Sequence, residues 1–211
     1  MNVDISGGTF TAPTSGKTFT VSGNWTKTTG TFTAGTGTVD FTYYSTITGA
    51  TTFYNLTFSG GPSYRYISDD LIVQNNLSIT QAWSGTGIQA DGSETHTISV
   101  AGNVIHSGTT YMEADLTTVM NGTTTQSVTT SSTGYIGSLK ISNTSATISL
   151  GSNLLMTGTL TIDLNTTLDV TATNYNMTIQ GGWTRNGTFT QRQGTVDFTY
   201  YSTITGATTF Y

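Results

Sequence analysis

The last eighteen residues of the chain, 194–211, repeat residues 37–54 letter for letter. The similarity continues upstream of this identity with one residue dropped, so residues 1–54 correspond to residues 158–211. Self-similarity at a fixed spacing is typical of solenoids and arrays, in which each unit packs on its neighbours. The sequence therefore predicts a stretch of a repeat array and argues against a compact domain with a single enclosed active site.

A shorter spacing lies inside the long one. The pattern of residues 19–25 (FTVSGNW) recurs at 98–104 (ISVAGNV) and again at 177–183 (MTIQGGW), and each step is 79 residues. The match is one of pattern, with apolar residues two apart and Gly or Asn at the corners. We therefore expect one continuous array over residues 1–211. Its sub-repeats are expected at approximately 1–26 (partial), 27–105, 106–184 and 185–211 (partial).

The periodicity within each unit is that of β-strands. Val39, Phe41 and Tyr43 alternate with Asp40 and Thr42, and such alternation buries one face of a strand while the other contacts water. Clusters of Gly, Asn, Ser and Asp interrupt these runs at the intervals expected of turns. No stretch has the apolar spacing of an amphipathic helix, so we expect an all-β protein.

Two all-β architectures fit this pattern. In a β-solenoid, each unit of 79 residues would form about four coils of ~20 residues, stacked ~4.8 Å apart. In the alternative, tandem β-sandwich domains of about 79 residues would each contain about seven strands. The apolar runs are short, and the phrase Asn-apolar-Ser/Thr-apolar occurs twice within one unit, at Asn55 and at Asn76. Both features favour the solenoid, also called a parallel β-helix.

Composition excludes several partners. Charged residues are 8% of the chain, against roughly 25% in ordinary soluble domains, and the net charge is −5. The six Lys and Arg residues are scattered, whereas a nucleic-acid site needs them clustered. Apolar runs are too short for a membrane span in this segment. Threonine supplies 51 of 211 residues, which suits strands because a branched Cβ packs well on a pleated surface.

The repeat phrases carry a resemblance. GNWT (23–26), GTFTAGTGTV (30–39) and TTFYNLTF (51–58) resemble the repeats of long secreted prokaryotic surface proteins of the adhesin and autotransporter-passenger kind. The resemblance covers essentially the whole chain, and it implies a parallel β-helix of pectin-lyase type, an extracellular or cell-surface location, and a structural or adhesive role. Its motifs mark architecture, so it implies no catalytic residue.

Residues that could carry chemistry have simpler structural explanations. A polysaccharide-active β-helix needs an acidic cluster with a basic residue nearby, and the sequence offers Asp69 and Asp70, four and five residues after Arg65. The adjacent carboxylates fit a turn better than a catalytic pair. His96 and His106 have no third ligand type near them in sequence, and there is no cysteine. We therefore expect no enzyme activity, no metal site and no cofactor.

Aromatic residues have greater functional potential. Trp25 and Trp183 follow a Gly-Asn or Gly-Gly corner and alternate with Val104 in the repeat, so they are predicted to lie in the core. If Tyr43 faces inward with Val39 and Phe41, then Tyr44 and its repeat counterpart Tyr201 face solvent. Exposed tyrosines could stack on sugars or pack against a neighbouring subunit. The candidate interface aromatics are Tyr44, Tyr201 and Tyr211.

Asn-X-Ser/Thr sequons form a third set of candidate sites. A glycan could attach to them on a cell-surface protein if the asparagines lie on outward corners, although the repeated Asn-X-Thr phrase by itself raises their number. The glycosylation candidates are Asn24, Asn55, Asn76, Asn121, Asn143, Asn165, Asn176 and Asn186.

These observations predict a non-enzymatic structural protein, a segment of an extracellular filament, stalk or sheath. In the first copy TTFY is followed by NLTFSGG, and the chain begins with the similar NVDISGG. We therefore expect another copy of the chain, or flanking repeats of a longer chain, to supply the strand that follows Tyr211, and a contact of this kind generates an open filament. The alternative is an adhesin that binds glycans or other cells, and a more remote alternative is a polysaccharide-active enzyme.

Overall fold

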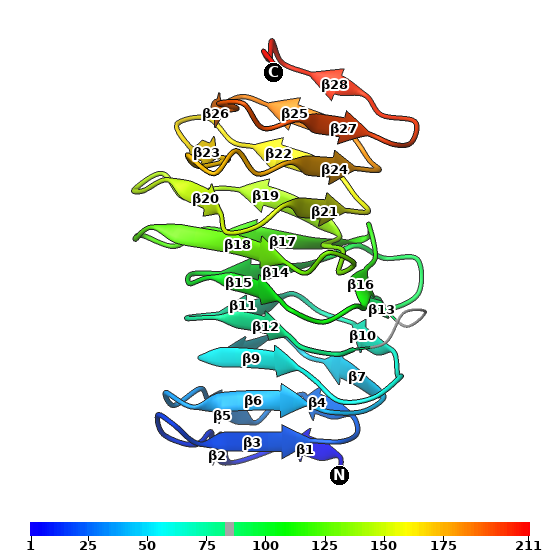
Figure 1. Cartoon of the computed structure of the whole chain (residues 1–211). Coiled ribbons are helices and arrows are strands. Elements are labelled where there is room, and N and C mark those ends of the chain that lie inside the picture. The colour runs from blue at the N-terminus through cyan, green and yellow to red at the C-terminus, as the bar shows by residue number, and fades with distance from the viewer. Residues whose placement is uncertain (83–86) are drawn as a thin grey trace.

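The computed structural model describes residues 1–82 and 87–211. Secondary structure in this part of the chain consists of 28 β-strands, and the strand pairs are parallel. The strands wind into a β-solenoid of about nine turns. Figure 1 shows a rod with the N-terminus at one end and the C-terminus at the other. The solenoid prediction is confirmed, and the tandem β-sandwich alternative is wrong.

Five parallel sheets form three faces that run along the rod, and each turn contributes one segment to each face. Face 1 contains β1 (Val3–Ile5), β4 (Trp25–Lys27), β7 (Ser45–Thr48), β10 (Arg65–Ile67), β13 (Gly87–Ala90) and β16 (Tyr111–Met112), and then β21 (Leu154–Met156), β24 (Met177–Ile179) and β27 (Val196–Phe198). Between β16 and β21, residues 135 and 136 form single pairs with Tyr111 and Met156 and so carry face 1 through one further turn.

Face 2 begins with a two-stranded sheet, whose strand β5 contacts the first strand of an eight-stranded sheet. Its members are β2 (Thr9–Thr11), β5 (Thr31–Thr33), β8 (Thr51–Phe53), β11 (Leu71–Val73), β14 (His96–Val100), β17 (Leu116–Met120), β19 (Ser138–Ile141), β22 (Leu160–Ile162), β25 (Trp183–Arg185) and β28 (Ile204–Thr205).

Face 3 is a continuous nine-stranded sheet. Its members are β3 (Thr18–Val21), β6 (Thr38–Phe41), β9 (Asn55–Phe58), β12 (Leu77–Ile79), β15 (Val104–His106), β18 (Gln126–Thr130), β20 (Ile148–Leu150), β23 (Thr167–Asp169) and β26 (Thr188–Thr190).

The core is a set of apolar columns that run parallel to the rod axis. On face 3, the strand register places similar side chains above one another on successive turns. One such column contains Phe19, Val39, Leu56, Leu77, Val104 and Val128. All but the first of these are buried. Each strand needs only one to three inward residues, which explains why strands of two to five residues suffice.

Corners are held by asparagine ladders. The side-chain oxygen of Asn55 accepts a hydrogen bond from the backbone N–H of Asn76 (3.3 Å), and that of Asn76 accepts one from the N–H of Asn103 (2.9 Å). Asn103 continues the series by accepting from the N–H of Ser127 (2.8 Å). The recurrent Asn at the start of a strand therefore satisfies a backbone donor of the next turn, which is the requirement on any buried corner.

The 79-residue step does not contain a whole number of turns. Trp25 lies on face 1 in β4, Val104 on face 3 in β15, and Trp183 on face 2 in β25. From β4 to β15 the chain advances eleven strands, and from β15 to β25 it advances ten named strands plus the segment at residues 135–136, again eleven. Eleven strands are three turns plus two faces, slightly less than the expected four coils. Equivalent residues in successive units therefore lie on different faces.

Candidate functional site: a tyrosine row beside a polar hollow

Tyrosines gather on the outer surface of face 1, which Figure 1 shows as the side formed by β7, β10, β13 and β16. Tyr111 pairs with Tyr135 of the next turn and with Gly87 of the preceding turn. Both tyrosines are half-buried, while Met112 and Ile136 beside them point into the core. The two rings therefore occupy one outward column on adjacent turns.

Two earlier turns extend this column. Tyr44 and Tyr64 directly precede Ser45 and Arg65, which are paired and buried. Tyr66 has the same outward parity, and its ring centroid lies 6.0 Å from that of Tyr64 and 5.7 Å from that of Tyr44. We refer to Tyr44, Tyr64, Tyr66, Tyr111 and Tyr135 as the tyrosine row.

Gly87 joins the two parts of the row. A Cβ atom at Gly87 would lie 3.2 Å from the ring of Tyr111, so this ring covers the glycine. The Tyr111 side chain also shares a hydrogen bond with that of Tyr64, one turn beyond Gly87. The missing side chain at this position lets the rings of two non-adjacent turns meet.

A polar hollow of about 560 Å³ adjoins the C-terminal end of the row. It lies where face 1 lacks a regular strand, at residues 135 and 136. Gly137 stands between Glu113 and Thr157 in the outward column, so no side chain fills the space between them. Thr157 bridges this gap by donating a hydrogen bond from Oγ1 to the backbone oxygen of Met112, two turns away (2.6 Å). The residues that line the hollow are Tyr111, Glu113, Ala114, Tyr135, Thr157 and Gln180.

The row and the hollow are acidic or neutral. Burial raises the pKa of Glu113, and the neighbouring carboxylate of Asp115 raises it further. The pKa of Tyr111 is also raised, first by burial and then by Glu113, and burial raises that of Tyr66. The tyrosine hydroxyls therefore remain protonated donors at neutral pH. None of the described residues that form the row or line the hollow is Lys or Arg.

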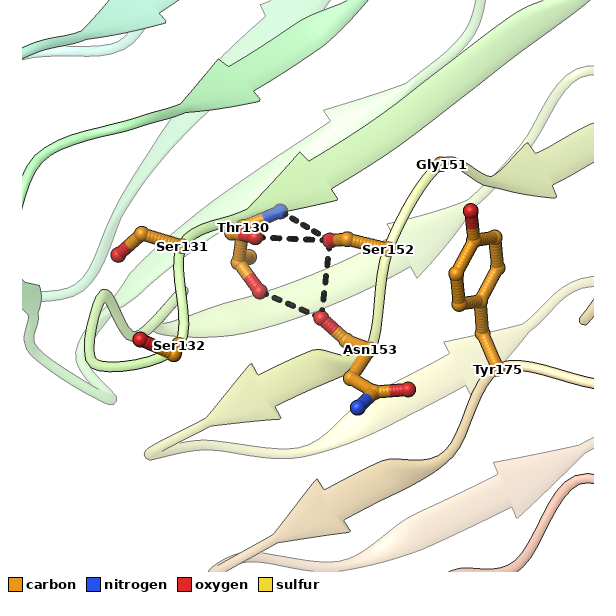
Figure 2. Close-up of a pocket in the computed structure, with 7 residues that line it drawn as sticks. All are labelled: Thr130, Ser131, Ser132, Gly151, Ser152, Asn153 and Tyr175. Carbon is orange, nitrogen blue, oxygen red and sulfur yellow. Dashed lines mark hydrogen bonds between the residues drawn. The ribbon is translucent and has the colours of Figure 1, made fainter.

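A second hollow, of about 320 Å³, lies at the corner that follows β18. Figure 2 shows that its polar atoms bind one another: Ser152 Oγ donates to the Thr130 backbone oxygen (2.8 Å), and Thr130 Oγ1 donates to the Asn153 backbone oxygen (2.7 Å). Tyr175 flanks it. Because these groups are largely satisfied internally, the hollow offers a ligand fewer free donors than the one beside Glu113.

The three aromatics singled out from the sequence lie in different surroundings. Tyr44 is 49% exposed and belongs to the row, whereas Tyr201 is 93% exposed and Tyr211 is 71% exposed, both away from it. Tyr43 was expected to face inward with Val39 and is instead 58% exposed. The reason is that β6 ends at Phe41, so the alternation stops before Tyr43 is reached.

Most of the row was missed by sequence reasoning. Tyr64, Tyr66, Tyr111 and Tyr135 stand in no repeated phrase, so nothing in the repeat pattern marked them. Their spacing does carry a signal: Tyr44 to Tyr64 is 20 residues and Tyr111 to Tyr135 is 24, each about one turn.

The sequons occupy several environments. The side chains of Asn24, Asn121, Asn165, Asn176 and Asn186 are exposed, those of Asn55 and Asn76 are half-buried, and that of Asn143 is buried. The Nδ2 atom of Asn143 donates to the Thr124 backbone oxygen (2.7 Å) and to Gln126 Oε1 (3.1 Å). A glycan on this nitrogen has no room in the folded chain. Glycan attachment at the other seven remains a prediction.

Asp69 and Asp70 serve as corner acceptors. Asp69 Oδ2 accepts from the backbone N–H of Gly49 (2.6 Å), and Asp70 Oδ1 accepts from that of Thr97 (2.8 Å). Each carboxylate thus ties its turn to an adjacent one and is occupied by a backbone donor.

Arg65 points into the solenoid, away from these carboxylates. Its guanidinium donates to the backbone oxygens of Ser59 (2.6 Å), Ser63 (2.6 Å) and Phe41 (3.3 Å). Burial lowers its pKa to about 10, and the charge of Asp40 opposes that shift. The structure therefore does not bring Arg65 together with Asp69 and Asp70 in one site.

The two histidines lie on different faces. His106 in β15 is fully buried between Ile79 and Thr130 of the adjacent turns. Burial lowers its pKa to about 4. His96 in β14 lies nearer the surface, with Nε2 3.3 Å from a carboxylate oxygen of Glu94. Within residues 1–82 and 87–211, no three His, Asp or Glu side chains gather closely enough to hold a metal ion.

Two further findings complete the description. In the described part of the chain, no helix has the length and apolar character needed to cross a membrane. Comparison of the chain with known protein families, with curated proteins and with solved structures found no match.

Proposed function

We propose that this chain forms part of the shaft of an extracellular filament, stalk or sheath, in which copies stack end to end and continue the solenoid. The observation that carries the proposal is the run of inward columns, in which one turn stacks on the next from β3 to β26 on face 3 alone. In such a rod, the sheet hydrogen bonds lie along the axis, so that the sheets of all three faces share an axial load.

The C-terminal turn offers a surface for stacking. Ile204 of β28 is 50% exposed, whereas its counterpart Ile47 in β7 is fully buried, because β10 packs beside β7. A further turn, supplied by another copy or by flanking repeats of a longer chain, would bury Ile204 in the same way. Apolar burial is worth roughly 25 cal/mol per Å², and an exposed sheet edge is a template for pairing with another chain.

Composition supports the extracellular part of the proposal. Charged residues are 8% of the chain, and Thr alone supplies 51 residues. A surface that is polar but nearly uncharged is unusual for an isolated soluble domain and suits a polymer whose copies must approach one another closely.

Sedimentation velocity over a wide concentration range, combined with negative-stain electron microscopy, tests stacking. We expect species that lengthen with concentration, and we expect Ile204→Asp to abolish them by burying a charge at the junction. Leu164→Asp is the matched control, because Leu164 is 68% exposed at a corner between β22 and β23. A chain that sediments as a monomer at every concentration would count against self-stacking.

A second candidate function is that of an adhesin whose rod surface binds glycans. The specific observation in its favour is the tyrosine row, because half-buried aromatic rings on the outer surface of one face suit contact with a ligand better than core filling.

A further inference from the structure

The tyrosine row has the geometry of a site for a linear ligand. The row covers five turns, stacked about 4.8 Å apart, from β7 to the segment at residues 135–136. Four of them carry a ring, while the third, at Gly87 in β13, is covered by the ring of Tyr111. It is one or two side chains wide, since only Tyr66 lies beside the main column. A ligand that touches several rings must therefore lie along the axis.

The chemistry of the rings specifies a flat, partly apolar surface on the ligand. Tyrosine presents a large apolar face with little loss of conformational entropy and carries one hydroxyl at its edge. The C–H faces of a pyranose ring match such a surface, and its hydroxyls lie at the rim where they can bind the phenol groups. The rings of Tyr64 and Tyr66 contact each other, with their centroids 6.0 Å apart. Half-buried rings in such contact are already ordered before a ligand binds.

The polar hollow supplies the directional contacts. Gln180 brings an amide, Thr157 brings a hydroxyl oxygen that can still accept while its proton goes to the Met112 backbone oxygen, and Glu113 lies on the other side of Gly137 in the outward column. Donors and acceptors of this mixed kind bind ligand hydroxyls, each of which both donates and accepts. Because the hollow adjoins Tyr111 and Tyr135, one ligand can stack on the rings and reach the hollow.

The acidic groups near the tyrosine row argue against negatively charged polymers as ligands. Single-stranded nucleic acid also stacks on aromatic rows, but its sites need a positive groove. Here the charged groups that accompany the rings on the outer surface are acidic, namely Asp91 beside Tyr66 and Glu113 with Asp115 beside Tyr111, while Arg65 between Tyr64 and Tyr66 is fully buried. These carboxylates would repel phosphate, sulfate or uronate groups.

We propose that the tyrosine row and the polar hollow together bind an uncharged polysaccharide chain that lies along the rod axis. The proposal rests on the adhesin candidate and deepens it by naming the surface and the ligand class. It does not depend on end-to-end stacking, which sedimentation measures separately.

Affinity electrophoresis in native gels tests the proposal, with hydroxyethyl cellulose, mannan or glycogen as uncharged probes and alginate as the charged comparison. We expect the folded chain to be retarded by at least one uncharged polysaccharide and not by alginate. Tyr111→Ala and Tyr135→Ala should each weaken binding about tenfold, the size expected for removing one stacking ring. Tyr43→Ala and Tyr201→Ala are matched controls outside the row and should leave binding unchanged.

Conservative variants keep the test valid if an alanine variant fails to fold. Tyr135→Phe retains the ring, so it should bind within about threefold of the unaltered chain. Glu113→Gln retains a hydrogen-bonding group while removing the charge, and should also keep binding. Three results would overturn the proposal: no retardation by any uncharged probe, equal retardation of the row variants and the controls, or stronger binding to alginate. Loss of lateral rod association in the row variants without any polysaccharide effect would assign the row to contacts between copies instead.

Discussion

The two copies of the longer repeat, residues 1–54 and 158–211, share the packing around their tryptophan and differ in their place in the rod. In the first copy, Trp25 lies 4.8 Å from Phe32 and 5.4 Å from Phe53, measured between ring centroids. In the second, Trp183 lies 4.8 Å from Phe189 and 5.2 Å from Phe210. Each indole N–H donates to the equivalent threonine, at 3.2 Å in the first copy and 3.0 Å in the second. The aromatic cluster is therefore a local unit that its sequence specifies.

The face that each copy occupies is not local. The segment Ser45–Thr48 forms β7 on face 1, whereas its counterpart forms β28 on face 2. The shift follows from the two steps of eleven strands that separate the copies. As a result, Tyr44 joins the tyrosine row, whereas Tyr201 lies against Tyr200 at a different corner. Identical residues thus acquire different surroundings from the number of strands that precede them.

The largest expected difference between the copies concerns core removal. Phe53 is fully buried, whereas Phe210 is only half-buried, because β11 packs beside β8. Phe53→Ala should lower the local free energy of unfolding by about 3–5 kcal/mol, and Phe210→Ala should cost clearly less. Hydrogen exchange of the amides of each copy measures both. If the two alanine substitutions lowered the free energy of unfolding equally, the two phenylalanines would be equally buried, and the contrast between the copies would be wrong.

Acid should destabilise the middle of the rod, where His106 lies, more than either copy of the repeat. His106 has its pKa lowered to about 4 in the folded chain, so the unfolded chain binds more protons below the ordinary value of 6.5. Stability contributed by neutral His106 is therefore present above about pH 6.5 and is lost as the pH falls to about 4, by up to about 3 kcal/mol.

Amide exchange around β12, β15 and β18 between pH 7 and pH 4 measures this loss. His106→Leu, which continues the apolar column of Phe58 and Ile79, should remove the pH dependence in these strands. His96→Asn is the control and should retain it. Acid-induced opening that begins instead in the aromatic clusters would contradict this assignment.

A glycine pair should respond alike in the two copies. Gly49 and Gly206 have φ of 89° and 87°, and a Cβ would lie 1.9 Å from the Lys27 oxygen and 2.0 Å from the Arg185 oxygen respectively. Alanine at either position should destabilise its own copy by about 1–3 kcal/mol. The check is local amide exchange, and a cost at one glycine alone would mean that the corner geometry depends on the face.

The smallest expected contrast is between the tyrosines. Tyr44→Ala should cost about 0.5–1.5 kcal/mol, because its ring contacts Tyr66. Tyr201→Ala should stay within about 0.5 kcal/mol, as is usual for an exposed side chain. Chemical denaturation monitored by circular dichroism resolves a difference of this size. Equal losses of stability would show that Tyr44 in the row is no more strongly packed than Tyr201 at its corner.

Strands, their buried sides and core positions can be predicted from the sequence, because they depend on residues that are close together in the chain. Alternation of Val39 and Phe41 identifies a strand and its buried side, and the placement of Trp25 and Trp183 after a corner identifies core positions; both features are present in the structure. The position of Asn55 and Asn76 at strand starts follows from the backbone donors that they satisfy.

The face that a segment occupies depends on the number of strands that precede it, and this could not be predicted from the sequence. The segment Tyr135–Ile136 lies between Gly134 and Gly137 and pairs by single residues. Two residues carry no alternation, so nothing in the sequence marks them as a turn of face 1. Without this segment the copies would share one face. The hollow, which lies beside this segment, was missed for the same reason.

Disulfide trapping around this segment tests the account most directly, because the chain has no cysteine of its own. Residues that pair on adjacent turns lie about 4.8 Å apart, within the Cα range of a disulfide, whereas residues two turns apart lie about 9.6 Å apart. We predict rapid oxidation of the pairs Tyr111→Cys with Tyr135→Cys and Tyr135→Cys with Leu155→Cys, and none of Tyr111→Cys with Leu155→Cys. Rapid oxidation of the last pair, with none of the first two, would contradict the eleven-strand step and place both copies on one face.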